Sequence, residues 1–141
     1  MSAIIGDMYA ADLQAGFLET LGSLGEIGLT PQAALLVFQS RLRAGHRTYV
    51  ARGAERIVGT ATLLVERKFL RGGAPVGHLE DLAVHPDHRR QGIGSALVRH
   101  VADEAKKLGC GRLLLRCGPE FAPFFTRLGC VQHEAGLRWD L

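Results

Sequence analysis

The chain has no long apolar segment and few cysteines. No stretch approaches the run of about 18 apolar residues that a membrane-spanning helix needs, and the N-terminus lacks the basic start and apolar core of a secretory signal. We therefore expect a cytoplasmic protein without a membrane partner. The three cysteines, Cys110, Cys117 and Cys130, are an odd number without Cys-x-x-Cys spacing. This pattern favours free thiols over disulfide bonds or a metal site.

Several ligand-binding signatures are also missing. The formal net charge is only +3, and no basic run with interleaved aromatic residues occurs, which argues against a nucleic-acid partner. The Gly-x-x-x-x-Gly-Lys-Ser/Thr loop that holds nucleoside triphosphates is absent. The chain has 141 residues without repeats, low-complexity tracts or linkers. These features predict one domain, residues 1–141, that binds small anionic ligands.

The most informative segment is a strand that leads through a basic loop into a helix. Apolar residues at Leu79, Leu82 and Val84, with carboxylates between them, indicate a strand over residues 77–84, and residues 93–108 carry apolar side chains at helical spacing. Gly92 and Gly94 leave backbone N–H groups bare where the helix starts, and the helix dipole favours an anion there. Leu97 stands where a dinucleotide-binding fold has its third glycine. The segment therefore predicts a pyrophosphate site of another kind.

The remaining patterns predict two helices before any strand, followed by alternating elements. Thr30 and Pro31 form a typical helix start, because a capping hydroxyl precedes proline at the first helical position. The expected elements, in order αα-βββ-α-β-α-β, are helices at 7–24 and 31–42, strands at 49–51, 57–65 and 77–84, a helix at 93–108, a strand at 112–115, a helix at 121–128 and a strand at 132–139.

The run Arg89-x-x-Gly92-x-Gly94 resembles the acyl-CoA motif of the GNAT acetyltransferase superfamily, written Gln/Arg-x-x-Gly-x-Gly/Ala. The resemblance implies an α/β (α+β) fold, a single domain whose central, mixed and mostly antiparallel sheet is flanked by helices. It also implies acetyl-CoA as the acetyl donor and no metal. The implied cofactor contacts are Leu82, Ala83, Val84, Arg89, Arg90, Gln91, Gly92, Ile93, Gly94 and Arg116.

Two longer strings resemble the glucosamine 6-phosphate N-acetyltransferases. They are Val65-Glu66-Arg67-Lys68-Phe69 and Gly77-His78-Leu79-Glu80-Asp81. This resemblance implies acetyl transfer to the amine of glucosamine 6-phosphate by direct attack in a ternary complex, for UDP-N-acetylglucosamine biosynthesis, by a homodimer. Two alternatives stay open. The chain could acetylate another amine, such as another aminosugar or a protein N-terminus, or it could be a CoA-binding module without catalysis.

The same resemblance implies the acceptor site. Glu80 and Asp81 are the candidate catalytic residues, and we expect Glu80 to orient the ammonium group and relay its proton. Because neighbouring strand residues point to opposite faces, only one of the two carboxylates is expected to face the sugar. The implied acceptor contacts are Ser23, Lys68, Phe69, Leu70, Arg71, Glu80, Asp81, Leu82, Gly111, Arg112 and Arg138.

Two positions depart from this family. Phe125 replaces a tyrosine, so no phenol can protonate the departing thiolate, and Arg116 replaces an acidic residue. We therefore expect slower chemistry or water as the proton source. The histidines have no serine or cysteine beside them in sequence that would suggest a triad. His85 and His88 are accordingly interpreted as solvent-exposed loop residues.

Overall fold

The computed structural model describes residues 2–141, which form one five-stranded sheet with strands in sequence order. The first four strands pair antiparallel and the fifth pairs parallel to the fourth. The predicted mixed, mostly antiparallel sheet is thus confirmed. The strands are β1 (Ile4–Asp7), β2 (Arg47–Arg52), β3 (Ile57–Glu66), β4 (Val76–Val84) and β5 (Leu113–Leu114).

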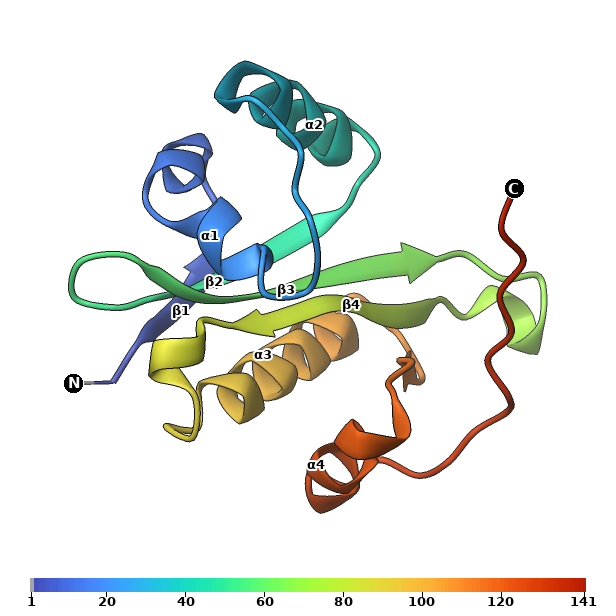
Figure 1. Cartoon of the computed structure of the whole chain (residues 1–141). Coiled ribbons are helices and arrows are strands. Elements are labelled where there is room, and N and C mark those ends of the chain that lie inside the picture. Colours follow the sequence, from blue (N-terminus) through green and yellow to red (C-terminus); the bar gives the residue numbers. More distant parts are fainter. Residues whose placement is uncertain (1) are drawn as a thin grey trace.

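Helices cover both faces of this sheet, with α1 and α2 on one face and α3 and α4 on the other (Figure 1). The helices are α1 (Phe17–Leu21), α2 (Pro31–Arg43), α3 (Ile93–Lys107) and α4 (Ala122–Arg127). Short 3-10 turns are η1 (Ala10–Gln14), η2 (Arg71–Gly73), η3 (Pro86–His88) and η4 (Pro119–Phe121). The predicted start of α2 is confirmed, because Thr30 Oγ1 accepts a hydrogen bond from the Ala33 N–H at 3.1 Å. Within residues 2–141, no helix is both long and apolar enough to cross a membrane.

The main core lies between the sheet and α3. Leu97 and Val101 of α3 are fully buried against the sheet. Gly59 of β3 permits this close approach, because a Cβ atom there would lie 2.9 Å from both Ile93 Cγ2 and Leu97 Cδ1. A single glycine therefore sets how closely the first turn of α3 packs on the sheet.

The predicted order holds from β2 to α4 and is wrong at the two ends. Residues 7–24 do not form one helix, since β1 pairs with β2 first and Gly16, at φ 95°, then separates η1 from α1. The expected strand at 132–139 is absent. Leu137 and Trp139 are 89% and 88% exposed. A strand needs a neighbour for its backbone groups, and within residues 2–141 this segment pairs with none.

Candidate active site

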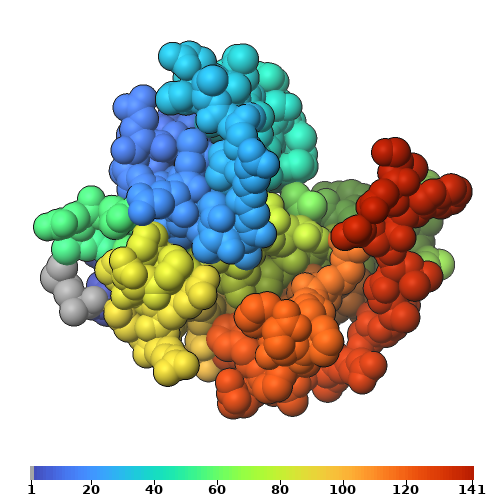
Figure 2. Space-filling view, in the orientation of Figure 1, coloured from blue at the N-terminus to red at the C-terminus, as the bar shows by residue number. Residues whose placement is uncertain are grey.

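The sheet opens between β4 and β5. The two strands pair only at Gly77–Leu113 and His78–Leu114. Beyond these pairs, the stretch Leu79–Val84 has no strand on its β5 side within residues 2–141. Apart from the Val84 carbonyl, which accepts a hydrogen bond from Arg89, its backbone N–H and C=O groups on that side have no strand partner and can pair with an extended ligand. In Figure 2 the surface here lies between the yellow loop that follows β4 and the orange segment around α4.

A β-bulge lies in β4 at the expected catalytic residues. Thr62 pairs with Glu80 and Thr60 pairs with Ala83, so that two residues of β4 oppose Ala61. Asp81 has a φ of 50°, a left-handed conformation that a bulge imposes. The alternation expected between Glu80 and Asp81 is interrupted here. Asp81 lines the same cavity as Thr62, whereas Glu80 pairs with Thr62 without lining that cavity. That only one carboxylate faces the acceptor stays a prediction.

The basic loop leads from β4 into α3 with an open anion-binding geometry. Gly92 is the N-cap of α3, has a φ of 80°, and receives no capping side chain. A Cβ atom at Gly92 would contact nothing within 4 Å, so the space beside the N-cap is open. The first-turn N–H groups of a helix have no intrahelical partner and can bind an anion there. Ile93 is buried and anchors this turn, whereas Arg90 and Gln91 are exposed. Such a loop fits the pyrophosphate of a nucleotide-containing ligand.

Two further expected cofactor residues flank the opening. Arg89 Nε donates a hydrogen bond to the Val84 carbonyl at 3.2 Å, which ties the loop to the end of β4. Arg116 follows β5 and is exposed on the opposite side of the opening. The structure therefore brings Leu82–Val84 and Arg89–Gly94 together along one strand end and one loop. Arg116 stands apart from this run.

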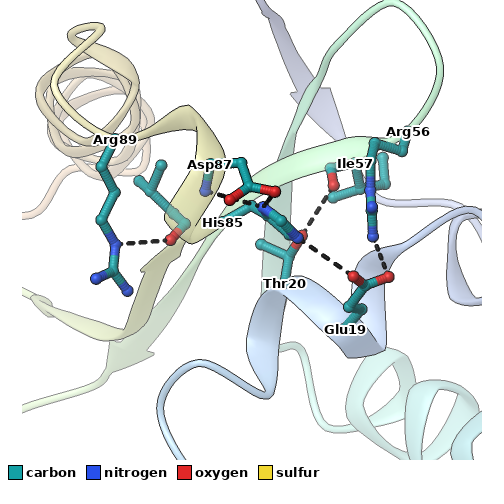
Figure 3. A network of polar contacts seen from close by, with 8 residues as sticks. Glu19, Thr20, Arg56, Ile57, His85, Asp87 and Arg89 are labelled. Atoms are coloured by element: carbon teal, nitrogen blue, oxygen red, sulfur yellow. Dashed lines mark hydrogen bonds and ion pairs between the residues drawn. The ribbon is translucent and has the colours of Figure 1, made fainter.

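A polar network, of which His85 is the buried member, joins α1 to the start of the loop (Figure 3). His85 is 8% exposed, so its interpretation as a solvent-exposed loop residue is wrong. Its Nδ1 accepts a hydrogen bond from the Asp87 N–H at 3.2 Å. Because a backbone N–H can only donate, Nε2 carries the ring hydrogen and donates to Glu19 Oε1 at 3.3 Å. His85 therefore holds the loop against α1.

Glu19 completes this network by pairing with Arg56 of the β2–β3 connection. The hydrogen bond from Arg56, and next the one from His85, hold the pKa of Glu19 below its usual value. This network has no counterpart among the features predicted from the sequence. Its partners lie 66 and 37 residues apart, and no local pattern signals contacts at such separations.

Lys68 and Arg112 lie at the other end of β4. Lys68 Nζ pairs with Glu66 at 3.0 Å, and His78 Nε2 lies 2.9 Å from the same carboxylate. Lys68, and next His78, lower the pKa of Glu66. The Gly111 N–H donates to the Pro75 carbonyl at 3.4 Å, which places residues 111–112 beside the connection that contains Lys68–Arg71.

Other expected acceptor contacts are dispersed and exposed. Ser23 follows α1, and Phe69 extends fully into solvent. Arg138 lies in the C-terminal segment and pairs with Asp140 at 2.9 Å. Phe125, where the resembled family has a tyrosine, is buried in the core beside α3. The expected cofactor residues other than Arg116 thus lie along one strand end and one loop, whereas the expected acceptor residues Ser23, Phe69 and Arg138 lie at separate places.

A cavity of about 740 Å³ lies between α1, α2 and the sheet. Thr60, Thr62 and Asp81 line its sheet side, and Arg41 lines it from α2. Sequence analysis did not single out Arg41. Its position in the last turn of α2 is that of an ordinary helix-terminal cation, so its local pattern gave no functional signal.

A mixed sheet that opens beside a glycine loop and a helix N-terminus defines a class of α+β domains that can bind a pyrophosphate-containing ligand along a strand edge. The particular family follows from comparison, since residues 16–129 match the model of the acetyltransferase (GNAT) family. The chain belongs to the GNAT acetyltransferase family.

Relatives with similar sequence and structure indicate which members of this family the chain resembles. The chain is 36% identical over 127 residues to the glucosamine 6-phosphate N-acetyltransferase of Trypanosoma brucei brucei, covering 88% of this chain and 86% of the relative. It is 35% identical over 138 residues to the probable glucosamine 6-phosphate N-acetyltransferase 2 of Oryza sativa subsp. japonica, covering 93% and 83%. The crystal structure of glucosamine-6-phosphate N-acetyltransferase from Arabidopsis thaliana superposes with a TM-score of 0.95, at 26% identity, over 99% of each chain.

Proposed function

We propose that this chain transfers the acetyl group of acetyl-CoA to the amine of glucosamine 6-phosphate, giving N-acetylglucosamine 6-phosphate. The open edge of β4 supports this proposal, because the expected cofactor residues Leu82–Val84 lie on that edge and follow Glu80 and Asp81 on the same strand. The names of the relatives that match most of the chain support this choice of acceptor.

The loop and the open strand edge have the chemistry to hold acetyl-CoA, which supplies the acetyl group as a thioester. The N–H groups around Gly92 and Gly94, with the charges of Arg89 and Arg90, suit a pyrophosphate. The free edge at Leu82–Val84 suits the amide-containing pantetheine arm, which can pair with it as a strand would. Arg116 offers a further charge from the β5 side.

The bulge positions the groups that act on the acceptor. Glu80 and Asp81 attract the ammonium group, and Glu80 takes its proton through water so that the nitrogen can attack the acetyl carbonyl carbon. A backbone N–H of the bulge donates to the carbonyl oxygen as negative charge develops there. The carbon–sulfur bond then breaks. Phe125 has no hydroxyl to donate, so the second proton of the attacking nitrogen passes through water to the departing sulfur.

We also propose that the acceptor site is completed in a homodimer. In the C-terminal segment, Leu137, Trp139 and Leu141 alternate and are all exposed, as expected for one face of a strand that pairs elsewhere. Pairing with a partner protomer would cover these side chains and bring Arg138 toward the partner's acceptor site. There it would join Lys68, Arg71 and Arg112 as phosphate-binding cations. The cytoplasmic location and the role in UDP-N-acetylglucosamine biosynthesis stay predictions.

The test is an assay of free CoA thiol with several amines. We expect turnover with glucosamine 6-phosphate, much less with unphosphorylated glucosamine, and a dimer mass by light scattering. Turnover only with a different amine would identify another GNAT acetyltransferase. Binding of acetyl-CoA without turnover on any amine would identify a non-catalytic CoA-binding module.

A further inference from the structure

His85 is the buried anchor of a loop that is otherwise accessible to solvent. Its backbone N–H donates to the Val58 carbonyl at 2.8 Å, and the residue is 8% exposed. Ile93, at the start of α3, is the next buried residue along the chain, and residues 86–92 between them are exposed or half-buried. The loop that carries the expected coenzyme residues Arg89–Gly92 is therefore fixed to the protein interior at its two ends.

The shape of this loop is not one that a free backbone keeps. Arg90 has a φ of 60°, a left-handed conformation that is unfavourable for a residue with a Cβ atom. Gly92 has a φ of 80°, which glycine adopts without steric cost. A residue such as Arg90 stays in its conformation when the surrounding structure holds it there. The contacts of η3, the first turn of the loop, therefore bear on whether the N–H groups before α3 are in place for a pyrophosphate.

The two ring nitrogens of His85 make two different contacts (Figure 3). Nδ1 accepts a hydrogen bond from the Asp87 N–H at 3.2 Å, which lies within the loop. Nε2 donates to Glu19 Oε1 at 3.3 Å, which lies outside it. The Asp87 carboxylate is 3.9 Å from Nδ1, too far for a hydrogen bond. The ring thus holds η3 through the backbone of Asp87 and is itself oriented by α1.

We propose that His85 is a positioning residue for acetyl-CoA, because its Nδ1 preorganises the loop that binds the pyrophosphate. This inference rests on the coenzyme site of the proposed function. A loop that adopts its binding shape for a fraction of the time binds its ligand more weakly in proportion to that fraction. Loss of the Nδ1 contact therefore weakens acetyl-CoA binding, although His85 is not among the expected coenzyme contacts. A purely structural alternative is that His85 only ties α1 to the sheet through Glu19.

Two substitutions separate the roles of the two nitrogens. His85→Asn keeps a short acceptor that can bond the N–H two residues further on, as asparagine does in turns, but its side chain is too short to reach Glu19. His85→Gln keeps an amide N–H at the reach of Nε2 but places no acceptor beside the Asp87 N–H. The pair therefore tests the contact within the loop against the contact with α1.

Isothermal titration calorimetry with acetyl-CoA alone measures the first contact. We expect the dissociation constant to rise roughly three- to tenfold in His85→Gln, the effect of one lost hydrogen bond, and to stay close to the original value in His85→Asn. The melting temperature should show the opposite order. His85→Asn should melt lower, because it loses the link to α1 and leaves space at a buried position.

His88→Gln is the matched control from the same turn. The ring of His88 packs edge-on against that of His85, with ring centroids 5.6 Å apart, and among residues 2–141 it accepts no hydrogen bond from the Asp87 N–H. This variant should bind acetyl-CoA as the original protein does. A rise in the dissociation constant as large as that of His85→Gln would overturn the proposal, because any change in the turn would then have the same effect.

The remaining outcomes distinguish the assignment from the proposed function. If acetyl-CoA affinity falls in both His85 variants in step with their melting temperatures, His85 is only a structural tie and the proposal is wrong. If the original protein binds acetyl-CoA and His85→Gln binds it equally well, the assignment of His85 fails and the proposed function stands. If the original protein does not bind acetyl-CoA, the proposed function fails together with this inference.

Discussion

The coenzyme half and the acceptor half of the site are built in different ways. The coenzyme half, Leu82–Gly94, is continuous in sequence and lies on one strand end, one loop and one helix turn. The acceptor half draws on Ser23, Lys68–Arg71, Gly111–Arg112 and Arg138, which lie in four separate segments. In our proposal, donor binding is thus encoded locally, whereas acceptor selection depends on how distant segments and two protomers come together.

The variant with the largest expected effect is Glu80→Gln, which removes the proposed proton acceptor without changing the shape of β4. It distinguishes the acceptor half of the site from the coenzyme half. We expect kcat to fall on the order of 10²- to 10⁴-fold, the usual contribution of general acid–base catalysis. The KM for acetyl-CoA should stay unchanged. Steady-state kinetics with both substrates varied would measure each effect.

Glu55→Gln is the matched control, because Glu55 is an exposed carboxylate in the β2–β3 connection. It should leave kcat and both KM values unaltered. An increase in the KM for acetyl-CoA in Glu80→Gln, with kcat preserved, would contradict the division between the halves at the bulge.

A second variant, Gly59→Ala, should disturb the coenzyme half from inside the core. The added methyl group would meet Ile93 and Leu97 at 2.9 Å, and such overpacking costs about 1–3 kcal/mol of unfolding free energy. We expect the melting temperature to fall by roughly 2–4 °C per kcal/mol, and the KM for acetyl-CoA to rise as the first turn of α3 moves. Calorimetry and kinetics would measure both.

Gly25→Ala serves as the control for this variant, since a Cβ at Gly25 would contact nothing within 4 Å. Equal melting temperatures for the two variants would show that α3 adapts to the extra volume. A raised KM for glucosamine 6-phosphate alone would mean that Gly59 belongs to the acceptor half.

The smallest expected effect concerns the polar network of Glu19 with His85 and Arg56, which connects α1 to the loop after β4. Because the folded-state pKa of Glu19 is lowered from its usual 4.5, its stabilising contribution is present above that value and is lost as pH falls through the lowered pKa. Glu19→Gln should therefore lower the urea midpoint slightly at pH 7, and the difference should disappear once the pH has fallen below the lowered pKa of Glu19. A difference that persists at acid pH would contradict this linkage.

Much of the fold could be predicted from the sequence because its signals are local. The hydroxyl of Thr30 before Pro31 marked the start of α2, and periodic apolar residues marked α3. The ends could not be predicted in this way. Residues 4–7 form a strand only because β2 offers an edge to them, and residues 132–139 find no such edge within one chain.

In the site, too, the features with a local sequence signal could be predicted and those that depend on distant partners could not. The glycines at 92 and 94 predicted an open loop before a helix, and the structure has one. The bulge at Asp81 has no local sequence signal, because its φ of 50° depends on the register between β3 and β4. Arg41 and His85 were missed or misinterpreted since their roles depend on partners in other elements.

The open edge of β4 also affects the protein before any ligand binds. Unpaired N–H and C=O groups along a strand are a template on which other chains can aggregate. The stretch Leu79–Val84 is short, and the charges of Arg89 and Arg90 beside it oppose such pairing. A ligand that occupies the edge removes the template. We therefore expect the supply of acetyl-CoA to govern not only the rate of catalysis but also the fraction of newly made protein that stays in solution.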